Sequence, residues 1–195
     1  MMIELSAYII NLKHRIDRRD HMINEMKKFP VSYEFVDGIV DETKTCFRSQ
    51  KKCIQLAKEN NLPYVLVLED DAIFTDDAID IFQKTFNEIN SLTWDMFFLG
   101  ANLQSPAIRV SNSILQLSGA YAAHAYVVHE QFYDTIINLP HTCEMDVHYH
   151  NLMSSHNIYM CDPMIAYQLP SYSDLQDGYR DYNDAIFNNY LKYKP

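Results

Sequence analysis

Residues 64–71 read Tyr-Val-Leu-Val-Leu-Glu-Asp-Asp, an apolar run that ends in three consecutive carboxylates. The run follows Pro63 and has no helical spacing, which is typical of a β-strand covered on both faces in a parallel sheet. In open α/β sheets, ligands bind beyond the carboxyl ends of such strands. Adjacent carboxylates repel one another unless a cation or hydrogen bonds compensate. The triplet is therefore either a site for a hard cation such as Mg²⁺ or Mn²⁺, or a solvated acidic turn before the next helix.

In an extended chain, the three side chains of this triplet do not all point to the same side. Glu69 and Asp71 are two residues apart, so they point to the same side, whereas Asp70 points to the other. Either Glu69 with Asp71, or Asp70 alone, therefore faces the site. A Mg²⁺ ion is usually held by one or two carboxylates, with water and substrate phosphates as its other ligands.

Patterns typical of strands and helices alternate through the first half of the chain, which predicts an α/β sandwich. We expect strands at 7–12, 31–36, 64–68 and 95–99, and helices at 17–28, 43–60 and 76–90. In the second half we expect strands at 113–117 and 120–128 and helices at 130–139 and 146–156, with a mixed or antiparallel portion of sheet. The polar, tyrosine-rich end of the chain, 175–195, is predicted to be a flap over the site or an ordered tail.

Length and composition favour one globular domain spanning 1–195. A formal net charge of −10 argues against a nucleic-acid partner, since phosphate contacts need clustered Lys and Arg. The chain has neither a signal-peptide pattern nor a run of about 20 apolar residues, so we expect a soluble, cytoplasmic protein, in the host cytoplasm if the source is a virus. Four cysteines without CxxC spacing favour free thiols, and Cys46 and Cys53 are predicted to be small core residues on one helix face.

A basic segment lies between the first predicted strand and helix and contains Lys13, Arg15, Arg18 and Arg19. Asp17 can cap the helix, and the free backbone N–H groups and guanidinium groups then suit phosphate oxygens. The alternative is a solvated basic first turn. The segment is no Walker loop, because the chain contains no GxxxxGK[ST] sequence.

Two aromatic groups are weaker candidates. Four tyrosines, Tyr167, Tyr172, Tyr179 and Tyr182, suit stacking on a sugar or uracil ring, although such residues more often pack in the core or in loops. Histidines at 141, 148, 150 and 156 lack the spacing of a zinc site, and one of them is a candidate for a further cation ligand.

Several of these segments, in this order along the chain, resemble glycosyltransferase family 25, which includes lipooligosaccharide-type transferases and collagen galactosyltransferase relatives. The matching segments run from Tyr8 to Asp174: Tyr8-Ile9-Ile10-Asn11-Leu12 with Arg15, Asp17, Arg18 and Arg19; Val36-Asp37-Gly38; Leu68-Glu69-Asp70-Asp71; Trp94-Asp95-Met96 to Leu99-Gly100; Gly119-Ala120-Tyr121-Ala122; Asp146; and Gln168 with Ser173-Asp174. Each match is weak alone, but the ordered set is fairly specific.

The resemblance implies a GT-A fold, a nucleotide-sugar-binding α/β sandwich whose central, mostly parallel but mixed sheet is flanked by helices. It implies a nucleoside-diphosphate sugar bound over the carboxyl ends of the strands, with a divalent cation between its diphosphate and the acidic triplet. The implied cation ligands are Glu69 and Asp71. The predicted donor-binding residues are Asn11, Leu12, Arg15, Arg18, Arg19, Asp37, Arg48, Asp70, Gln168 and Asp174.

One element departs from the family pattern. The usual Gly-Cys-x-x-Ser-His reads Thr45-Cys46-Phe47-Arg48-Ser49-Gln50, which keeps the cysteine and serine but lacks the glycine and histidine. Arg48 can still reach a phosphate from the first turn of its helix, or it can be a surface residue. The departure raises the alternative of a nucleotide-sugar-binding module without turnover.

The predicted function is an inverting, cation-dependent transfer of a hexose, galactose or glucose, from a UDP-sugar to a glycan, lipooligosaccharide or glycoprotein acceptor. Such a reaction needs a base on the face of the sugar opposite the leaving group, and Asp146 is the candidate because it matches a family position. Asp146 is alternatively the N-cap of the following helix. A metal-dependent phosphatase is a weaker alternative, because the Asp-x-Asp-x-Thr sequence it would need is missing here.

Overall fold

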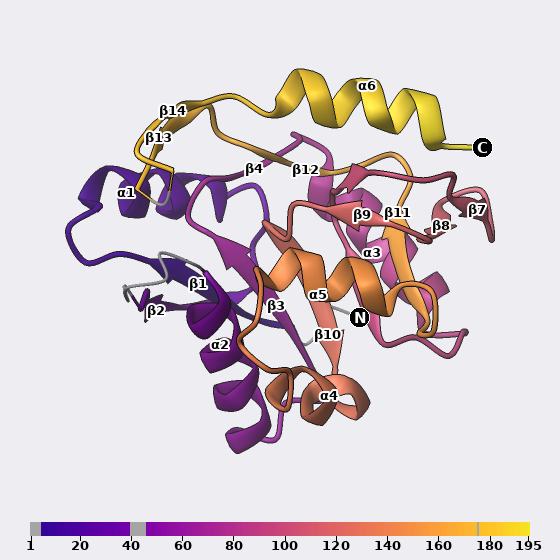
Figure 1. Ribbon diagram of the computed structural model, residues 1–195, viewed down its shortest axis with the longest axis horizontal. Helices are drawn as coiled ribbons and strands as arrows, with labels where there is room; N and C mark the ends of the chain where they lie inside the picture. Colours follow the sequence, from indigo (N-terminus) through magenta and orange to yellow (C-terminus); the bar gives the residue numbers. More distant parts are fainter. Residues whose placement is uncertain (1–4, 40–45, 175) are drawn as a thin grey trace.

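The computed structural model describes residues 5–39, 46–174 and 176–195. An eight-stranded sheet in the order β2-β1-β3-β10-β5-β11-β8-β7 lies between two layers of helices (Figure 1). Its strands are β1 (Ser6–Asn11), β2 (Ser32–Asp37), β3 (Tyr64–Glu69), β5 (Met96–Phe98), β7 (Ile108–Arg109), β8 (Ile114–Gln116), β10 (Ala125–His129) and β11 (Ile158–Cys161). The helices are α1 (Ile16–Glu25), α2 (Phe47–Glu59), α3 (Ala78–Ile89), η1 (Glu130–Phe132, a 3₁₀ helix), α4 (Tyr133–Ile137), α5 (Met145–Leu152) and α6 (Asn183–Tyr193).

The sheet is mixed, as predicted. Strand β1 pairs in parallel with β2 and β3, and β5 pairs in parallel with β11. Strand β10 is antiparallel to both of its neighbours, and β8 is antiparallel to β11 and β7. Strands β10 and β8 therefore run against the other six, and the predicted fold class is confirmed.

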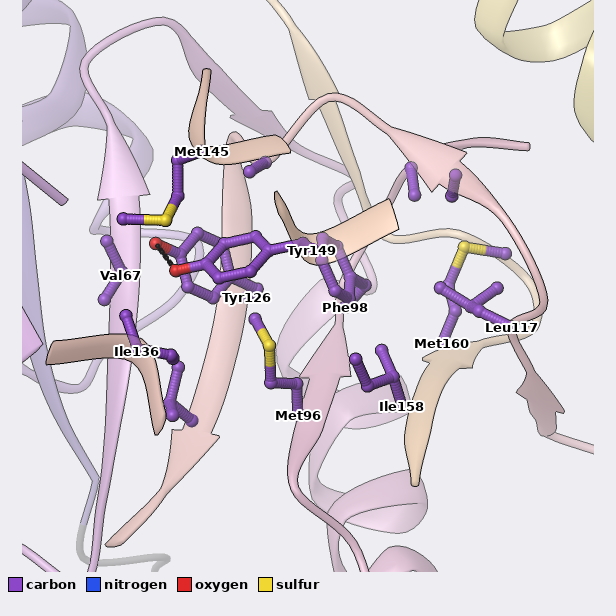
Figure 2. Packing of buried hydrophobic residues seen from close by; sticks show 14 of the residues in the cluster. Val67, Met96, Phe98, Leu117, Tyr126, Ile136, Met145, Tyr149, Ile158 and Met160 are labelled. Atoms are coloured by element: carbon purple, nitrogen blue, oxygen red, sulfur yellow. Dashed lines mark hydrogen bonds between the residues drawn. The ribbon is translucent and has the colours of Figure 1, made fainter. Parts of the chain in front are cut away.

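Side-chain alternation along the strands builds two hydrophobic cores, one on each face of the sheet. Val65 and Val67 of β3 belong to one core, whereas Leu66 and Leu68 belong to the other. The first core, part of which is shown in Figure 2, is covered by α2, α4, α5 and α6. The second is covered by α1 and α3, which contributes Phe82, Phe86 and Ile89. Each large apolar side chain buried in this way contributes roughly 1.5–3 kcal/mol.

The predicted strand at 120–128 is wrong in one respect, because the structure divides it. Ala122 has a φ of 68°, in the left-handed region, and breaks the chain into β9 (Ala120–Tyr121) and β10. The predicted helix at 130–139 is likewise divided into η1 and the short α4. The helix predicted at 43–60 is observed as α2 from Phe47, and positions 43–45 of that prediction lie outside the described residues.

Five short strands that the sequence did not predict complete the region around the sheet's carboxyl end. Strand β4 (Ala72–Phe74) pairs with β12 (Ala166–Gln168), and β6 (Asn102–Leu103) pairs with β9. A hairpin of β13 (Ser171–Ser173) and β14 (Gly178–Arg180) lies beside α1 (Figure 1).

The end of the chain is an ordered part of the fold. Helix α6 extends across the top of the molecule in Figure 1, and its Ile186 and Tyr190 are buried in the first core. Asp162 accepts hydrogen bonds from the Tyr190 hydroxyl and from Arg109 Nη2, the latter at 2.7 Å. The described residues of 175–195 include strand β14 and helix α6. Within 5–39, 46–174 and 176–195, no helix has the length and apolar character needed to cross a membrane.

Candidate active site

A cavity of about 500 Å³ opens where the parallel strands β1, β2 and β3 end. The residue after β1, Leu12, the two after β2, Gly38 and Ile39, and the acidic triplet all line it. Helices α2 and α5 and the segment from β12 to α6 complete the lining. The cavity therefore lies at the carboxyl ends of the strands, where ligands of open α/β sheets bind.

Glu69 is the last residue of β3 and follows Val65 and Val67 in the strand's alternation, so its side chain lies on the same side of the sheet as α2. Gln50 Nε2 of α2 donates a hydrogen bond to Glu69 Oε1 at 2.9 Å. Burial, followed by the nearby charge of Asp71, raises the pKa of Glu69 to about 8.

Asp70 lies on the opposite side, against the end of β1 and the start of α1. Asn11 Nδ2 donates to Asp70 Oδ2 at 2.8 Å, and Arg18 Nη1 donates to Asp70 Oδ1 at 2.7 Å. Both carboxylate oxygens of Asp70 therefore have hydrogen-bond partners within the protein.

Asp71 has a less complete set of partners. Its Oδ2 lies 3.4 Å from Arg18 Nη1, whereas its Oδ1 is buried without a hydrogen-bond partner. Burial raises the pKa of Asp71 and the charge of Asp70 adds to this effect, while Arg18 opposes it; the net shift is upward. Leaving a buried polar atom unpaired costs free energy, so this oxygen is suited to a ligand from the cavity.

The cavity is strongly acidic. Among the described residues that line it there are two guanidinium groups, from Arg18 and Arg180, and six carboxylates, from Glu69, Asp70, Asp71, Glu144, Asp146 and Asp174. Within the described ranges, no three His, Cys, Asp or Glu side chains form a group that would hold a metal ion by themselves. Glu69 and Asp71 nevertheless fit a hard cation of the Mg²⁺ type, which takes one or two protein carboxylates and completes its shell with substrate phosphates.

Asp146 lies on α5, which also lines the cavity. Its Oδ2 accepts a hydrogen bond from the backbone N–H of Ala122 at 3.5 Å. The alternative that Asp146 caps the helix is wrong, because α5 begins at Met145 and the N-cap position belongs to Glu144. Ala122 is a non-glycine residue in the left-handed region, a conformation that costs about 1–3 kcal/mol and that clusters at functional sites.

Arg18 is the residue of the basic segment that reaches the cavity. Besides Asp70, it contacts the hairpin, donating from Nη2 to Ser171 Oγ at 2.7 Å and to the Tyr172 carbonyl at 3.0 Å. Arg15 pairs with Asp17 and Asp174, and Arg19 lies over the Phe35 ring at 3.9 Å on the surface. The N-cap position of α1 belongs to Arg15, and Asp17 lies in the first turn and pairs with Arg15, so the predicted capping role of Asp17 is wrong.

The predicted site residues therefore fall into two groups. Those that line the cavity are Leu12, Arg18, Glu69, Asp70, Asp71, Asp146, Gln168 and Asp174. Those that the described part of the structure places away from the lining are Asn11, Arg15, Arg19, Asp37 and Arg48. Asn11 and Arg15 still contact lining residues, whereas Asp37 is exposed beside Lys13 and Arg48 is exposed on α2.

Several lining residues were not predicted. Gln50, Tyr121, Glu144 and Arg180 are brought to the cavity by packing between distant segments, and among the four candidate tyrosines Tyr182 is the one that lines it. Cys53 is buried as predicted, but Cys46 lines the cavity next to Glu69, because α2 begins only at Phe47. All four cysteines lie within the described residues and are free thiols. The rings of His148 and His150 pack against Phe47 and Tyr121, respectively.

Two solved structures have a similar fold. A glycosyltransferase involved in the glycosylation of the major capsid of PBCV-1 matches with a TM-score of 0.53 and 10% identity, over 95% of this chain and 98% of that one. A UDP-glucose pyrophosphorylase complexed with UDP-glucose matches with a TM-score of 0.50 and 7% identity, over 97% of this chain and 79% of that one. The fold is therefore GT-A-like, as predicted, and similar to that of these two solved structures.

The sequence identifies the family. The model of glycosyltransferase family 25 (LPS biosynthesis protein) matches residues 4–45 and 40–142. The chain belongs to glycosyltransferase family 25. A search of curated protein sequences gave no match. Family membership favours glycosyl transfer over the metal-dependent phosphatase considered above.

Proposed function

We propose that this protein is an inverting glycosyltransferase that requires a divalent cation and transfers a hexose, galactose or glucose, from a UDP-sugar to a glycan, lipooligosaccharide or glycoprotein acceptor. The observation that carries the proposal is the unpartnered, buried Oδ1 of Asp71 beside Glu69, in an acidic cavity at the carboxyl end of β3. Family membership supports the sugar-transfer chemistry.

The charge of the cavity supports the cation. A nucleoside diphosphate is an anion, and the described lining offers six carboxyl groups against two arginines, so added positive charge would favour its binding. Glu69 and Asp71 would hold Mn²⁺ or Mg²⁺ with one or two oxygens each. When bound, such a cation would stabilise the negative charge that develops on the departing diphosphate.

The other predicted site residues that line the cavity are assigned to binding the donor. Arg18 provides a fixed guanidinium group beside Asp70 and Asp71, and we assign it to the donor phosphates or ribose together with Asp70. Leu12, Gln168 and Asp174 also line the cavity and are assigned to donor binding.

Asp146 is the proposed general base. Inversion requires the acceptor hydroxyl to attack from the face opposite the leaving group, so the base must stand apart from the cation ligands. Asp146 belongs to α5, whereas Glu69 and Asp71 belong to β3 and its following turn, and all three line one cavity. The Ala122 N–H bond to Oδ2 orients the carboxylate, and Oδ1 remains to accept the proton.

A panel of nucleotide sugars, tested by thermal unfolding with and without Mn²⁺ and then for slow donor hydrolysis, tests the proposal. A UDP-sugar at a hundred times its Kd should stabilise the protein by about 2.7 kcal/mol when Mn²⁺ is present. Mn²⁺-dependent binding followed by hydrolysis or transfer supports the enzyme. Binding without turnover on any acceptor would support the non-catalytic module, and the absence of binding with every divalent ion would overturn both.

A further inference from the structure

A chain of hydrogen bonds leads from the core to Glu69. The Tyr149 hydroxyl donates to the Tyr126 hydroxyl at 3.1 Å, an interaction drawn in Figure 2. The Tyr126 hydroxyl donates to Gln50 Oε1 at 3.0 Å, and Gln50 Nε2 donates to Glu69 Oε1 at 2.9 Å. The four side chains come from four different elements, α5, β10, α2 and β3.

Packing alone does not account for this chain. Gln50, Tyr126 and Tyr149 are at most 2% exposed, and the two rings lie among apolar side chains that include Met96 and Phe98 (Figure 2). Phenylalanine would fill the same volume without bringing polar atoms into the core, where each unpaired one costs about 1–3 kcal/mol. The hydroxyl and amide groups in this series of hydrogen bonds therefore serve a purpose other than hydrophobic contact.

The direction in which these hydrogen bonds are donated indicates their function. Each donor points toward Glu69, so the bonds polarise one another in a single sense and end on a carboxylate. The Tyr126 hydroxyl also fixes the orientation of the Gln50 amide: because Oε1 accepts from Tyr126, the NH₂ group must face Glu69. Once Glu69 is ionised, as a bound cation would require, a rotated amide would place its oxygen against the carboxylate oxygen and repel it.

Tyr133 is a buried tyrosine outside this series of hydrogen bonds and serves for comparison. The Tyr133 hydroxyl donates to the backbone carbonyl of Leu62 at 3.1 Å and makes a purely local bond. Tyr149, by contrast, is three residues after Asp146 on α5, so both side chains project from the same side of that helix. The hydrogen-bonded chain therefore connects the helix of one cavity carboxylate to the side chain of another.

We propose that Gln50, oriented by Tyr126 and Tyr149, is a positioning residue that holds the Glu69 carboxylate in place for a divalent cation and ties it to the helix that carries Asp146. This inference rests on the proposed function and adds three residues to it. Partners that hold metal ligands from outside typically contribute 10- to 100-fold to metal affinity.

The test measures Mn²⁺ binding to the folded protein by electron paramagnetic resonance, in the presence of UDP, beside thermal unfolding of the same samples. Gln50→Met keeps the length of the side chain but removes the amide, and it should weaken Mn²⁺ binding 10- to 100-fold. Tyr126→Phe should weaken Mn²⁺ binding several-fold, because Tyr126 is one hydrogen bond further from Glu69 than Gln50. Tyr149→Phe should weaken it less, because Tyr149 is one bond further again. Gln50→His, which restores a ring N–H donor, should recover most of the affinity.

Tyr133→Phe is the matched control, since it also removes one buried hydroxyl donor. It should lower the unfolding temperature about as much as Tyr126→Phe but leave the Mn²⁺ affinity unchanged. The inference is overturned if Gln50→Met binds Mn²⁺ as tightly as the wild type, or if Tyr133→Phe weakens binding as much as Tyr126→Phe. If Gln50→Met does not fold, the comparison of Mn²⁺ affinity between Tyr126→Phe and Tyr133→Phe decides the test. A wild-type protein that binds no Mn²⁺ with UDP would overturn the proposed function together with this inference.

Discussion

Arg18 of α1 donates from Nη1 to Asp70 Oδ1 at 2.7 Å, and the same guanidinium group bonds through Nη2 to the β13–β14 hairpin. One side chain therefore joins the acidic triplet to the segment that covers the cavity. A planar guanidinium group can make both sets of bonds at once, but the compact ammonium group of lysine cannot.

We predict that Arg18→Lys loosens the hairpin although the positive charge is kept. The loss of the bond to Ser171 Oγ should cost about 1.5–3 kcal/mol, whereas the Tyr172 carbonyl keeps its hydrogen bond from Arg15 Nη1. Hydrogen exchange of the 171–180 backbone should become faster, and donor binding should weaken. Arg19→Lys, whose guanidinium group lies over Phe35 on the surface, is the control and should change neither; equal exchange rates in the two variants would contradict the role of Arg18.

Asp146→Asn should separate binding from chemistry. The amide keeps the size of the side chain but cannot accept a proton, so kcat should fall about 10²- to 10⁴-fold while the KM for the donor changes little. Steady-state kinetics with the best donor of the panel measures both constants. Asp80→Asn, also in the first turn of a helix but on α3, should leave kcat unchanged. If Asp146→Asn kept a nearly wild-type kcat, a residue other than Asp146 would have to be the general base.

Glu69→Gln should stabilise the protein in the absence of divalent cations. The pKa of Glu69 is about 8 in the folded protein against an ordinary 4.5, so the folded state holds this proton more tightly than the unfolded chain. The stability contributed by this proton is complete below pH 4.5 and is lost as the pH rises through 8. At pH 9, without cations, the variant should unfold a few degrees higher, at about 2–4 °C per kcal/mol.

The same comparison at pH 5 provides the internal control for Glu69. There the wild-type carboxyl group is largely protonated, so the difference between the two proteins should shrink. Differential scanning calorimetry in the presence of a chelator measures both midpoints. A variant that is less stable than the wild type at pH 9 would show that Glu69 is not under electrostatic strain.

Asp162 should make the attachment of α6 sensitive to acid. Burial alone would raise the pKa of Asp162, but hydrogen bonds from Tyr190 and Arg109 and the charge of Lys194 outweigh it, and the net pKa lies below the ordinary 3.8. Its contribution to stability is therefore present above pH 3.8 and is lost as the pH falls through the lowered pKa. Asp162→Asn should lose about 1–3 kcal/mol at pH 7, and its difference from the wild type should shrink as the pH falls below 3.8. Urea unfolding at several pH values measures this; a constant difference would exclude the ionic contribution.

The sequence predicts the sheet well where local patterns are strong. The apolar run at 64–68 with its acidic end is β3, and its alternation already assigns Glu69 and Asp70 to opposite sides. The break at Ala122 could not be foreseen, because neighbouring residues favour a strand and the left-handed conformation of an alanine depends on its surroundings. The start of α2 at Phe47 similarly places Cys46 on the cavity instead of the core.

The site was harder to predict wherever it depends on contacts between distant segments. Gln50 meets Glu69 only because α2 packs on β3, and the residue types alone do not indicate that contact. Arg15 and Arg18 both contact the hairpin, whereas Arg19 lies over Phe35, and the tertiary structure decides that Arg18 also reaches Asp70. Residue types predicted an acidic, phosphate-suited site, and the tertiary structure decides which of those residues share it.

The most direct test of the central claim is the affinity of UDP for the wild type and for Asp71→Asn, measured by isothermal titration calorimetry with Mn²⁺ and with a chelator. In the wild type, Mn²⁺ should tighten UDP binding at least tenfold, about 1.4 kcal/mol, because it bridges the diphosphate and the carboxylates. In Asp71→Asn that gain should largely disappear while the protein remains folded. Equal affinity for UDP with and without Mn²⁺ in the wild type, or an undiminished gain in Asp71→Asn, would contradict the account.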